Sequence, residues 1–244
     1  YPERLGVKLS EVLKSSVSNV LVIAESHIRT PENAEAVLSA NQADLVSIVR
    51  GQIADPHLAN KAKNGRSEEI RPCLSCNQMC WGRRSRDYWI SCLVNPTTGR
   101  EFEWGGDRLK KISTPKRILI VGGGPAGLEA ARVAAERGHM VTLAEALDYL
   151  GGQFRLAGMQ PRRGQIIDFL DWYLNQLSKL KVDIKLNTLI DAHYIKEFSA
   201  DATIIATGSY PNDTGFQKAM PHVEKLPGID QGGVFSAEEV MARR

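Results

Sequence analysis

Short apolar runs alternate with amphipathic stretches in the first part of the chain. Runs rich in Val and Ile at residues 19–24 and 43–49 predict two fully buried strands. Between them, Thr30 and the proline that follows have the residue types preferred at the N-cap and first position of a helix, and Asp55 and Pro56 repeat this signal after the second run. The β-α-β-α order predicts a parallel sheet with helical crossovers, at the end of a larger α/β body.

The second half of the chain repeats this alternation over a longer stretch. Its apolar periodicity predicts helices at 125–138 and 164–180 and strands at 117–121, 140–145, 182–186 and 202–207. Between the two halves, residues 64–115 have little periodicity and many turn residues. A segment of that length without regular structure is usually either functional or disordered.

Composition narrows the class of protein without identifying it. Of the 244 residues, 43% are apolar and 24% charged, which is ordinary for a soluble globular protein. The formal net charge of +3 is too small to favour nucleic acid or a membrane surface as a partner, and neither a spanning apolar run nor a signal-peptide pattern is present. We therefore expect a cytoplasmic protein that binds neither nucleic acid nor a membrane. The missing initiating Met favours a segment of a longer protein.

All four cysteines lie within residues 73–92, a segment we call the cysteine loop. Their spacing is C-x2-C-x3-C-x11-C, with Cys73, Cys76 and Cys80 close together and Cys92 apart from them. In a reducing compartment, clustered thiols indicate a metal site more often than disulfides. Three neighbouring ligands and a remote one favour a [4Fe–4S] cluster with one thiolate on each iron. A structural zinc ion, and thiols without a ligand role, stay open as alternatives.

A glycine loop follows the strand expected at 117–121 and opens the next helix. Its pattern is Gly122-x-Gly124-x-x-Gly127, the spacing of a dinucleotide-binding loop in its usual strand–helix context. Gly122 permits the tight turn, Gly124 lets the backbone approach a pyrophosphate, and Gly127 lets helix and strand pack closely. Glu145, 18 residues after Gly127 at the end of the next strand, is placed to accept hydrogen bonds from the adenosine ribose.

These features together resemble one family. The stretches "IAESHIRTPENAEAVL" and "CLSCNQMC", the glycine loop, "GGQFRLA" at 151–157 and "ATIIATGSYP" at 202–211 resemble the 2,4-dienoyl-CoA reductase and trimethylamine dehydrogenase family of NADH:flavin oxidoreductases. The resemblance implies three regions: the end of a (β/α)8 flavin barrel at 1–66, an iron–sulfur loop and linker at 67–114, and a Rossmann-like domain that binds FAD or ADP at 115–244. The barrel and the Rossmann-like domain would both be incomplete.

The resemblance also implies roles for individual residues. The four cysteines would ligate the [4Fe–4S] cluster. Arg50 and the backbone near Ser26 and His27 would hold the phosphate of FMN, with Ser26 and His27 standing where the family more commonly has Gly-Arg. The glycine loop and Glu145 would bind FAD, or ADP alone in the amine-dehydrogenase branch. The residues that would lie near this flavin are Gln153, Thr207 and Gly208.

The intact protein would accordingly be an NAD(P)H-dependent flavin oxidoreductase. NAD(P)H would reduce FAD, and the cluster would pass electrons singly to FMN, which would reduce an activated alkene such as a 2,4-dienoyl-CoA or an enoate. An amine or N-methyl dehydrogenase sending electrons to an electron-transfer protein is one alternative. Another is a non-catalytic nucleotide-binding subunit that docks the remainder of the barrel, on the same or another chain. The sequence identifies no catalytic residue, and we do not expect the segment alone to turn over a small-molecule substrate.

Overall fold

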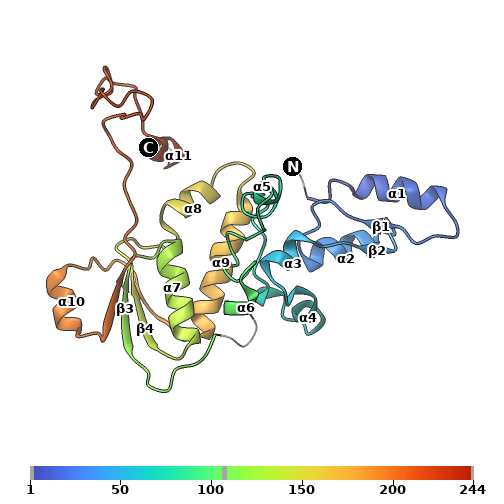
Figure 1. Ribbon diagram of the computed structural model, residues 1–244, viewed down its shortest axis with the longest axis horizontal. Coiled ribbons are helices and arrows are strands. Elements are labelled where there is room, and N and C mark those ends of the chain that lie inside the picture. The colour runs from blue at the N-terminus through green and yellow to red at the C-terminus, as the bar shows by residue number, and fades with distance from the viewer. Residues whose placement is uncertain (1–2, 106–108, 243–244) are drawn as a thin grey trace. The chain divides into compact units, whose positions relative to one another are not determined.

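The computed structural model describes residues 3–105 and 109–242 of the chain, which forms two compact units. The first unit runs to Lys111 and includes residues 171–176, and the second comprises residues 112–170 and those from 177 onward (Figure 1). Within the described residues, no helix combines the length and the apolar character needed to cross a bilayer.

Short helices accompany a two-stranded parallel sheet in the first unit (Figure 1). Ile23 lies opposite Leu45 in this sheet. The elements are α1 (Val7–Ser16), β1 (Ile23–Ala24), α2 (Pro31–Ser39), β2 (Leu45–Val46), α3 (Arg50–Ala54), α4 (Leu58–Lys63), a 3-10 turn (Ser67–Glu69), α5 (Trp81–Arg84) and α6 (Glu101–Trp104). The parallel pairing joined by a helix is the arrangement that the apolar pattern predicts.

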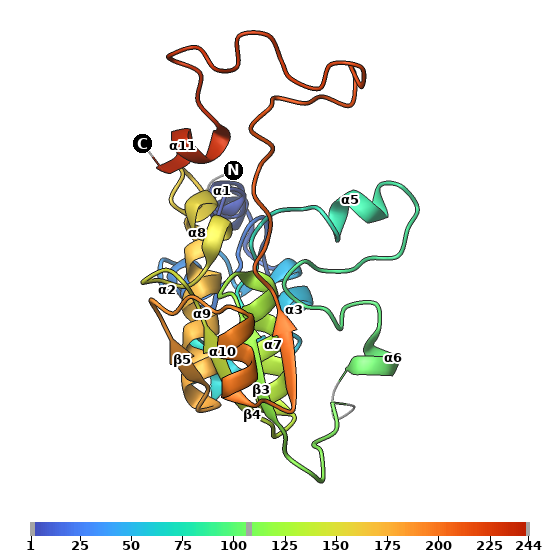
Figure 2. The ribbon, with the colours of Figure 1, turned by 90° about the vertical axis from the view of Figure 1, so that its left-hand side faces the viewer.

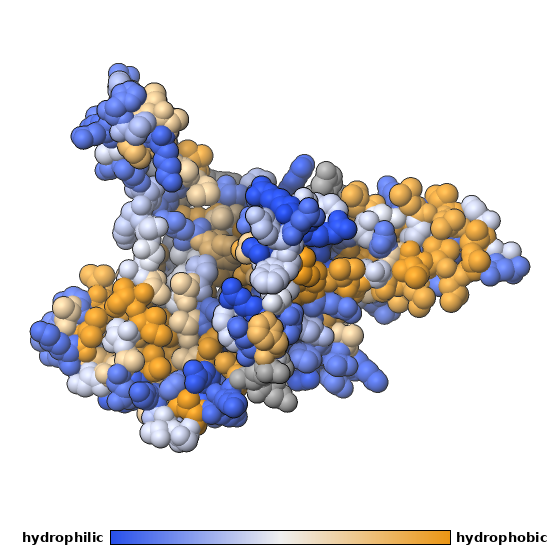
Figure 3. Space-filling model, viewed as in Figure 1, coloured by the Kyte–Doolittle hydropathy of each residue, from blue (hydrophilic) through white to orange (hydrophobic). Residues whose placement is uncertain are grey.

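Both strands of the first unit are shorter and less buried than the sequence predicts. Two residues of each apolar run pair, and Leu21 and Ile23 are 72% and 55% exposed. Among the described residues, β1 and β2 pair only with each other. Part of the apolar surface of each strand is therefore left uncovered. The prediction of fully buried strands is therefore wrong here. Figure 3 shows the resulting apolar surface over α1 and the strands beside it.

The helix predicted after Thr30 is confirmed. The Thr30 hydroxyl accepts a 3.2 Å hydrogen bond from the backbone N–H of Asn33, which caps α2. The core of the first unit combines α1, β1 and α2 with one residue after β1 and one before β2. Its buried members are Val7, Ala24, Ile28, Val37 and Ala43.

The prediction that Asp55 and Pro56 open a helix is wrong. An extra helix, α3, precedes Asp55, and α4 begins at Leu58. The buried Asp55 carboxylate instead accepts hydrogen bonds from the backbone N–H groups of His57 and Arg71 and from Nζ of Lys61. Burial alone would raise the pKa of Asp55, but these hydrogen bonds outweigh it and the pKa lies below its ordinary value. Asp55 thus ties α4 to the segment leading into the cysteine loop.

The second unit contains a four-stranded parallel sheet in the order β5-β4-β3-β6. Leu119 of the central strand lies opposite Thr142 of β4 and Thr203 of β6. The elements are β3 (Arg117–Val121), α7 (Pro125–Glu136), β4 (Met140–Ala144), α8 (Gly152–Gly158), α9 (Gly164–Lys179), β5 (Asp183–Lys185), α10 (Ala192–Phe198), β6 (Ala202–Ile205) and α11 (Ala237–Ala242). The predicted α/β class with a parallel sheet is confirmed.

Helices cover both faces of this sheet, with α7 on one side and α10 on the other (Figures 1 and 2). Leu119 packs against the α10 face, which includes Tyr194 and Phe198, and Leu128 of α7 is also buried. Because the strands are parallel, their carboxyl ends meet at one edge, where ligands of such sheets bind. The glycine loop follows β3 at that edge.

Candidate functional site

All four cysteine side chains line one small cavity in the first unit. Cys73, Cys76 and Cys80 approach it from one end of the cysteine loop and Cys92 from the other, and none forms a disulfide. The apolar residues around the same cavity are Ile53, Leu74, Met79, Leu93 and Val94. The fold therefore brings together the four thiols proposed as ligands.

The surroundings of Cys73 and Cys92 disfavour their charged forms. Burial raises the pKa of the Cys73 thiol, and a 3.3 Å hydrogen bond from the backbone N–H of Ser75 to its sulfur, together with the charge of Arg50, offsets part of that rise. Burial likewise raises the pKa of Cys92. Such thiols stay neutral until a metal displaces their protons.

Four thiols that border one cavity can serve a zinc ion or an iron–sulfur cluster. A structural zinc ion needs four ligands, with sulfurs about 2.3 Å from one centre. Throughout residues 3–105 and 109–242, no three His, Cys, Asp or Glu side chains are arranged to hold a single metal ion. A [4Fe–4S] cluster takes one thiolate on each of its irons, so its ligands stand around it. The four-thiol donor set around one cavity fits such a cluster.

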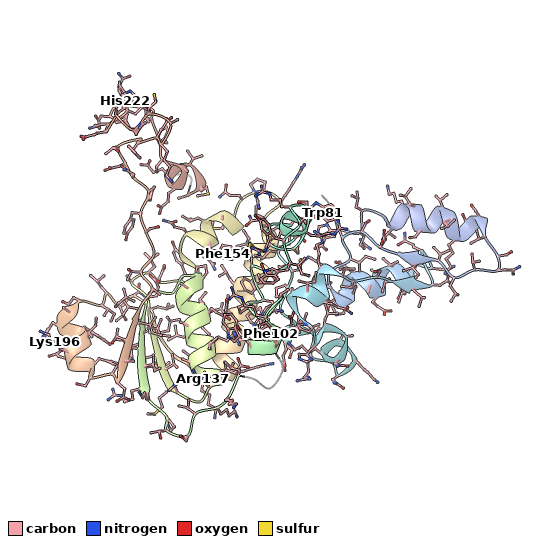
Figure 4. The ribbon with its side chains drawn as sticks, viewed as in Figure 1. Trp81, Phe102, Arg137, Phe154, Lys196 and His222 are labelled. Atoms are coloured by element: carbon pink, nitrogen blue, oxygen red, sulfur yellow. The ribbon has the colours of Figure 1, made fainter. Side chains whose placement is uncertain are left out.

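A second, larger cavity of about 350 Å³ also lies in the first unit. Ser26, His27 and Arg50, the residues expected to hold the FMN phosphate, all line it. Ser26 and His27 have positive φ angles of 74° and 62°, a conformation that is costly for residues with a Cβ and that clusters at functional sites. The remaining lining residues are Glu25, Ile28, Arg29, Ser47, Val49, Cys73, Ser75 and Trp81, the last labelled in Figure 4.

Arg50 and Cys73 line both cavities. Arg50 is the first residue of α3, and its Nη1 donates a 2.5 Å hydrogen bond to Oδ1 of Asn77 in the cysteine loop. The larger cavity thus has a basic side chain at the boundary that it shares with the cysteine cavity. Arg29 is held in an ion pair with Glu3, so Arg50 and His27 are the side chains of this cavity that suit an anion, with the carboxylate of Glu25 also lining it.

The glycine loop has the shape of a phosphate cradle. Gly122 has a φ of 107°, and a Cβ added there would lie 2.4 Å from the carbonyl oxygen of Ala206. A Cβ on Gly127 would lie 1.9 Å from the carbonyl oxygen of Gly122, whereas a Cβ on Gly124 would meet no atom within 4 Å. Gly124 is the N-cap of α7, so this open space lies at a helix N-terminus, where phosphates bind.

Glu145 directly follows β4 and supports the glycine loop. Its Oε2 accepts a 2.7 Å hydrogen bond from the backbone N–H of Gly123, and its Oε1 accepts one of 2.9 Å from Leu147. Each carboxylate oxygen can accept a further bond, so these contacts leave capacity for a ribose hydroxyl. Binding of the ribose by Glu145 stays a prediction.

The other predicted flavin neighbours also gather near this loop. Gln153 of α8 donates a 2.7 Å hydrogen bond from Nε2 to the carbonyl of Ser209, directly after Thr207 and Gly208. Gly208 has a positive φ of 78°, and the Cα of Thr207 would lie 3.1 Å from a Cβ on Gly122. The loops after β3 and β6 and the start of α8 therefore meet at one edge of the sheet.

Sequence reasoning missed two polar residues of the cysteine loop, Ser75 and Asn77. Ser75 bonds to His27 and Asn77 to Arg50, which are both residues of the larger cavity. The feature of the sequence that could have identified them is that they flank the proposed ligand Cys76. Their long-range partners could be identified only from the fold.

Residues 117–243 match the family model described as pyridine nucleotide-disulphide oxidoreductase. The chain is 43% identical to the NADH oxidase of Thermoanaerobacter brockii over 84% of its own length and 31% of that protein. It is 39% identical to the cinnamate reductase of Clostridium sporogenes, over 98% of its own length and 34% of the relative.

The fold of the chain is also similar to that of a solved structure. The 6-hydroxypseudooxynicotine amine oxidase of Pseudomonas geniculata is 29% identical and superposes with a TM-score of 0.92, over 100% of this chain and 36% of that one. The chain therefore spans about a third of the length of the relatives it matches.

Proposed function

The chain belongs to the pyridine nucleotide-disulphide oxidoreductase family, and we propose that it forms the electron-relay part of an iron–sulfur flavoprotein oxidoreductase. The reductase and amine oxidase relatives bear out the resemblance that the motifs predict. The observation that carries the proposal is that Arg50 and Cys73 line both the larger cavity and the cysteine cavity. A flavin in one and a cluster in the other would be neighbours.

In the first unit, the residues of the larger cavity would bind and orient FMN. Arg50 and His27 would contact its phosphate, and the left-handed backbone at Ser26 and His27 would turn the loop toward it. Cys73, Cys76, Cys80 and Cys92 would hold the cluster in apolar surroundings that limit access of water. Bound flavins would supply hydride and alkene chemistry, and the cluster would supply one-electron transfer.

In the second unit, the glycine loop and α7 would bind the pyrophosphate of FAD, or of ADP. Gly124 leaves the space for it, and the N-terminus of α7 favours its negative charge. Glu145 would accept hydrogen bonds from the ribose while it keeps the loop in shape through Gly123. Gln153, Thr207 and Gly208 would border the flavin ring.

For the intact protein we propose reduction of an activated alkene at FMN, with NAD(P)H as the source of electrons. The similarity to a cinnamate reductase, whose name specifies a conjugated alkene, supports this direction. The second candidate is oxidation of an amine at FMN, with electrons passed out to an electron-transfer protein. The similarity to an amine oxidase structure supports that candidate.

Residues 1–66, which belong to the first unit, would be the end of a (β/α)8 barrel, followed by the iron–sulfur region at 67–114 and the dinucleotide-binding domain at 115–244. The exposed apolar side chains of α1 and β1, such as Leu9 at 77% and Ile23 at 55%, support a further layer over this surface. The rest of the barrel would supply that layer, on this chain or on a partner chain. In the partner-chain case, this chain would be a nucleotide-binding subunit.

The test is the flavin content of two single variants of the intact protein. Arg50→Ala should lose FMN and keep FAD, because Arg50 lines the cavity of the first unit that is proposed for FMN and lies outside the glycine loop. Gly124→Ala should lose FAD and keep FMN, because the added Cβ occupies the open space at α7. Acid-released flavins separated by chromatography give both contents. Equal loss of both flavins in each variant, or no flavin in the parent protein, would refute the assignment.

A further inference from the structure

Ser75 lines the larger cavity of the first unit and is hydrogen-bonded to Cys73, which lines both cavities. Its hydroxyl lies 2.6 Å from Nε2 of His27, and both residues line the larger cavity. Its backbone N–H donates a 3.3 Å hydrogen bond to Sγ of Cys73, which lines the cysteine cavity as well. One residue is therefore hydrogen-bonded to a proposed phosphate ligand on one side and to a proposed cluster ligand on the other.

The backbone around Cys76 is held in an uncommon conformation. Ser75 and Asn77, which flank Cys76, have φ angles of 55° and 56°. This left-handed conformation is unfavourable for a residue with a Cβ, and Asn tolerates it better than Ser. Each flanking side chain is bonded to the larger cavity, Ser75 to His27 and Asn77 to Arg50. These two bonds fix the turn that carries Cys76.

We propose that Ser75 is a positioning residue that couples phosphate binding in the larger cavity to the reduction potential of the cluster. This inference rests on the proposed function, since it needs FMN in one cavity and a cluster in the other. The Ser75 hydroxyl orients His27 toward the phosphate, and the same bond fixes the Ser75 peptide so that its N–H reaches the Cys73 sulfur. A hydrogen bond to a ligand sulfur favours the reduced, more negative cluster and so raises its potential.

The experiment compares Ser75→Ala with the parent in the intact protein carrying its flavins and cluster. Ser85→Ala is the matched control, because Ser85 lies in the same loop and its hydroxyl donates to the carbonyl of Gly82, three residues away. Fluorescence titration gives the FMN dissociation constant, and an EPR-monitored redox titration at saturating FMN gives the cluster potential. We expect Ser75→Ala to weaken FMN binding about five- to tenfold, the effect of one lost hydrogen bond, and to lower the cluster potential. Ser85→Ala should change neither.

His27→Ala keeps the test decisive if Ser75→Ala fails to assemble the cluster. His27 lies outside the cysteine loop, so a merely structural role in that loop predicts no effect of this variant on the cluster potential. The coupling predicts a lower potential at parental iron content. An unchanged potential in His27→Ala, or unchanged FMN affinity in an iron-replete Ser75→Ala, overturns the inference. A parent protein without iron and flavin would instead contradict the proposed function.

Discussion

The backbone N–H of Gly123 donates a 2.7 Å hydrogen bond to the carboxylate of Glu145, which joins the loop after β3 to the end of β4. The second oxygen of the same carboxylate accepts a 2.9 Å hydrogen bond from the backbone N–H of Leu147. Glu145 therefore organises both loops without a nucleotide. A residue expected only to bind a ribose also shapes the cradle that would receive the pyrophosphate.

We predict that Glu145→Gln destabilises the protein by about 1–3 kcal/mol, because an amide has one acceptor oxygen for two N–H donors and carries no charge. Urea unfolding followed by circular dichroism measures the change. Glu197→Gln is the control, since both partners of its ion pair with His193 are exposed, at 68% and 77%, and such pairs contribute about 0–1 kcal/mol. Equal effects of the two variants would show that Glu145 does not organise the loops.

Two glycines of the loop should respond differently to the same substitution. Gly127→Ala places a Cβ 1.9 Å from a backbone oxygen, so helix and strand must separate and the thermal unfolding midpoint should fall by several degrees. Gly124→Ala meets no protein atom within 4 Å, so its midpoint without added nucleotide should stay close to that of the parent. Differential scanning fluorimetry distinguishes them. A larger fall for Gly124→Ala would contradict the packing described above.

Asp55→Asn should remove a pH-dependent stabilisation of the first unit. The pKa of Asp55 lies below its ordinary value, so its ionised form stabilises the fold above the unfolded pKa of about 3.9, and this contribution is lost as the pH falls through the folded pKa. At pH 7 we expect the variant to be less stable than the parent by about 2 kcal/mol, the scale of hydrogen bonds to a charged group.

The difference between parent and Asp55→Asn should shrink as the pH falls below about 4, where the parent also loses its charge. Urea unfolding at a series of pH values measures it, with the exposed Asp148 replaced by Asn as the control. A difference that is constant from pH 7 to pH 3 would show that the carboxylate charge is not responsible.

The second unit could be predicted well from the sequence because its signals are local. The apolar run at 117–121 coincides with β3, and the glycines mark a turn whose constraints lie within a few residues. The helices α8 and α10 were missed, each seven residues long, because such segments carry too few turns for a clear period. Their formation depends on packing against the sheet and, for α10, on the Asp191 side chain, which accepts a hydrogen bond at the N-terminus of the helix.

The first unit was predicted less well because its contacts are long-range. The runs at 19–24 and 43–49 have the composition of buried strands, yet only residues 23–24 and 45–46 pair, and Leu21 and Ile23 are exposed, because burial depends on neighbours and not on composition. The cysteine spacing identified one side of the site. The bonds of Ser75 to His27 and of Asn77 to Arg50 join residues 48 and 27 positions apart, and no local pattern predicts such pairs.

The most direct test of the account is the metal and sulfide content of the intact protein, purified without oxygen. We predict about four irons and four acid-labile sulfides per chain, lost together when Cys80 is replaced by Ala. Stoichiometric zinc without sulfide, or iron that persists in the Cys80→Ala variant, would contradict a cluster held by Cys73, Cys76, Cys80 and Cys92.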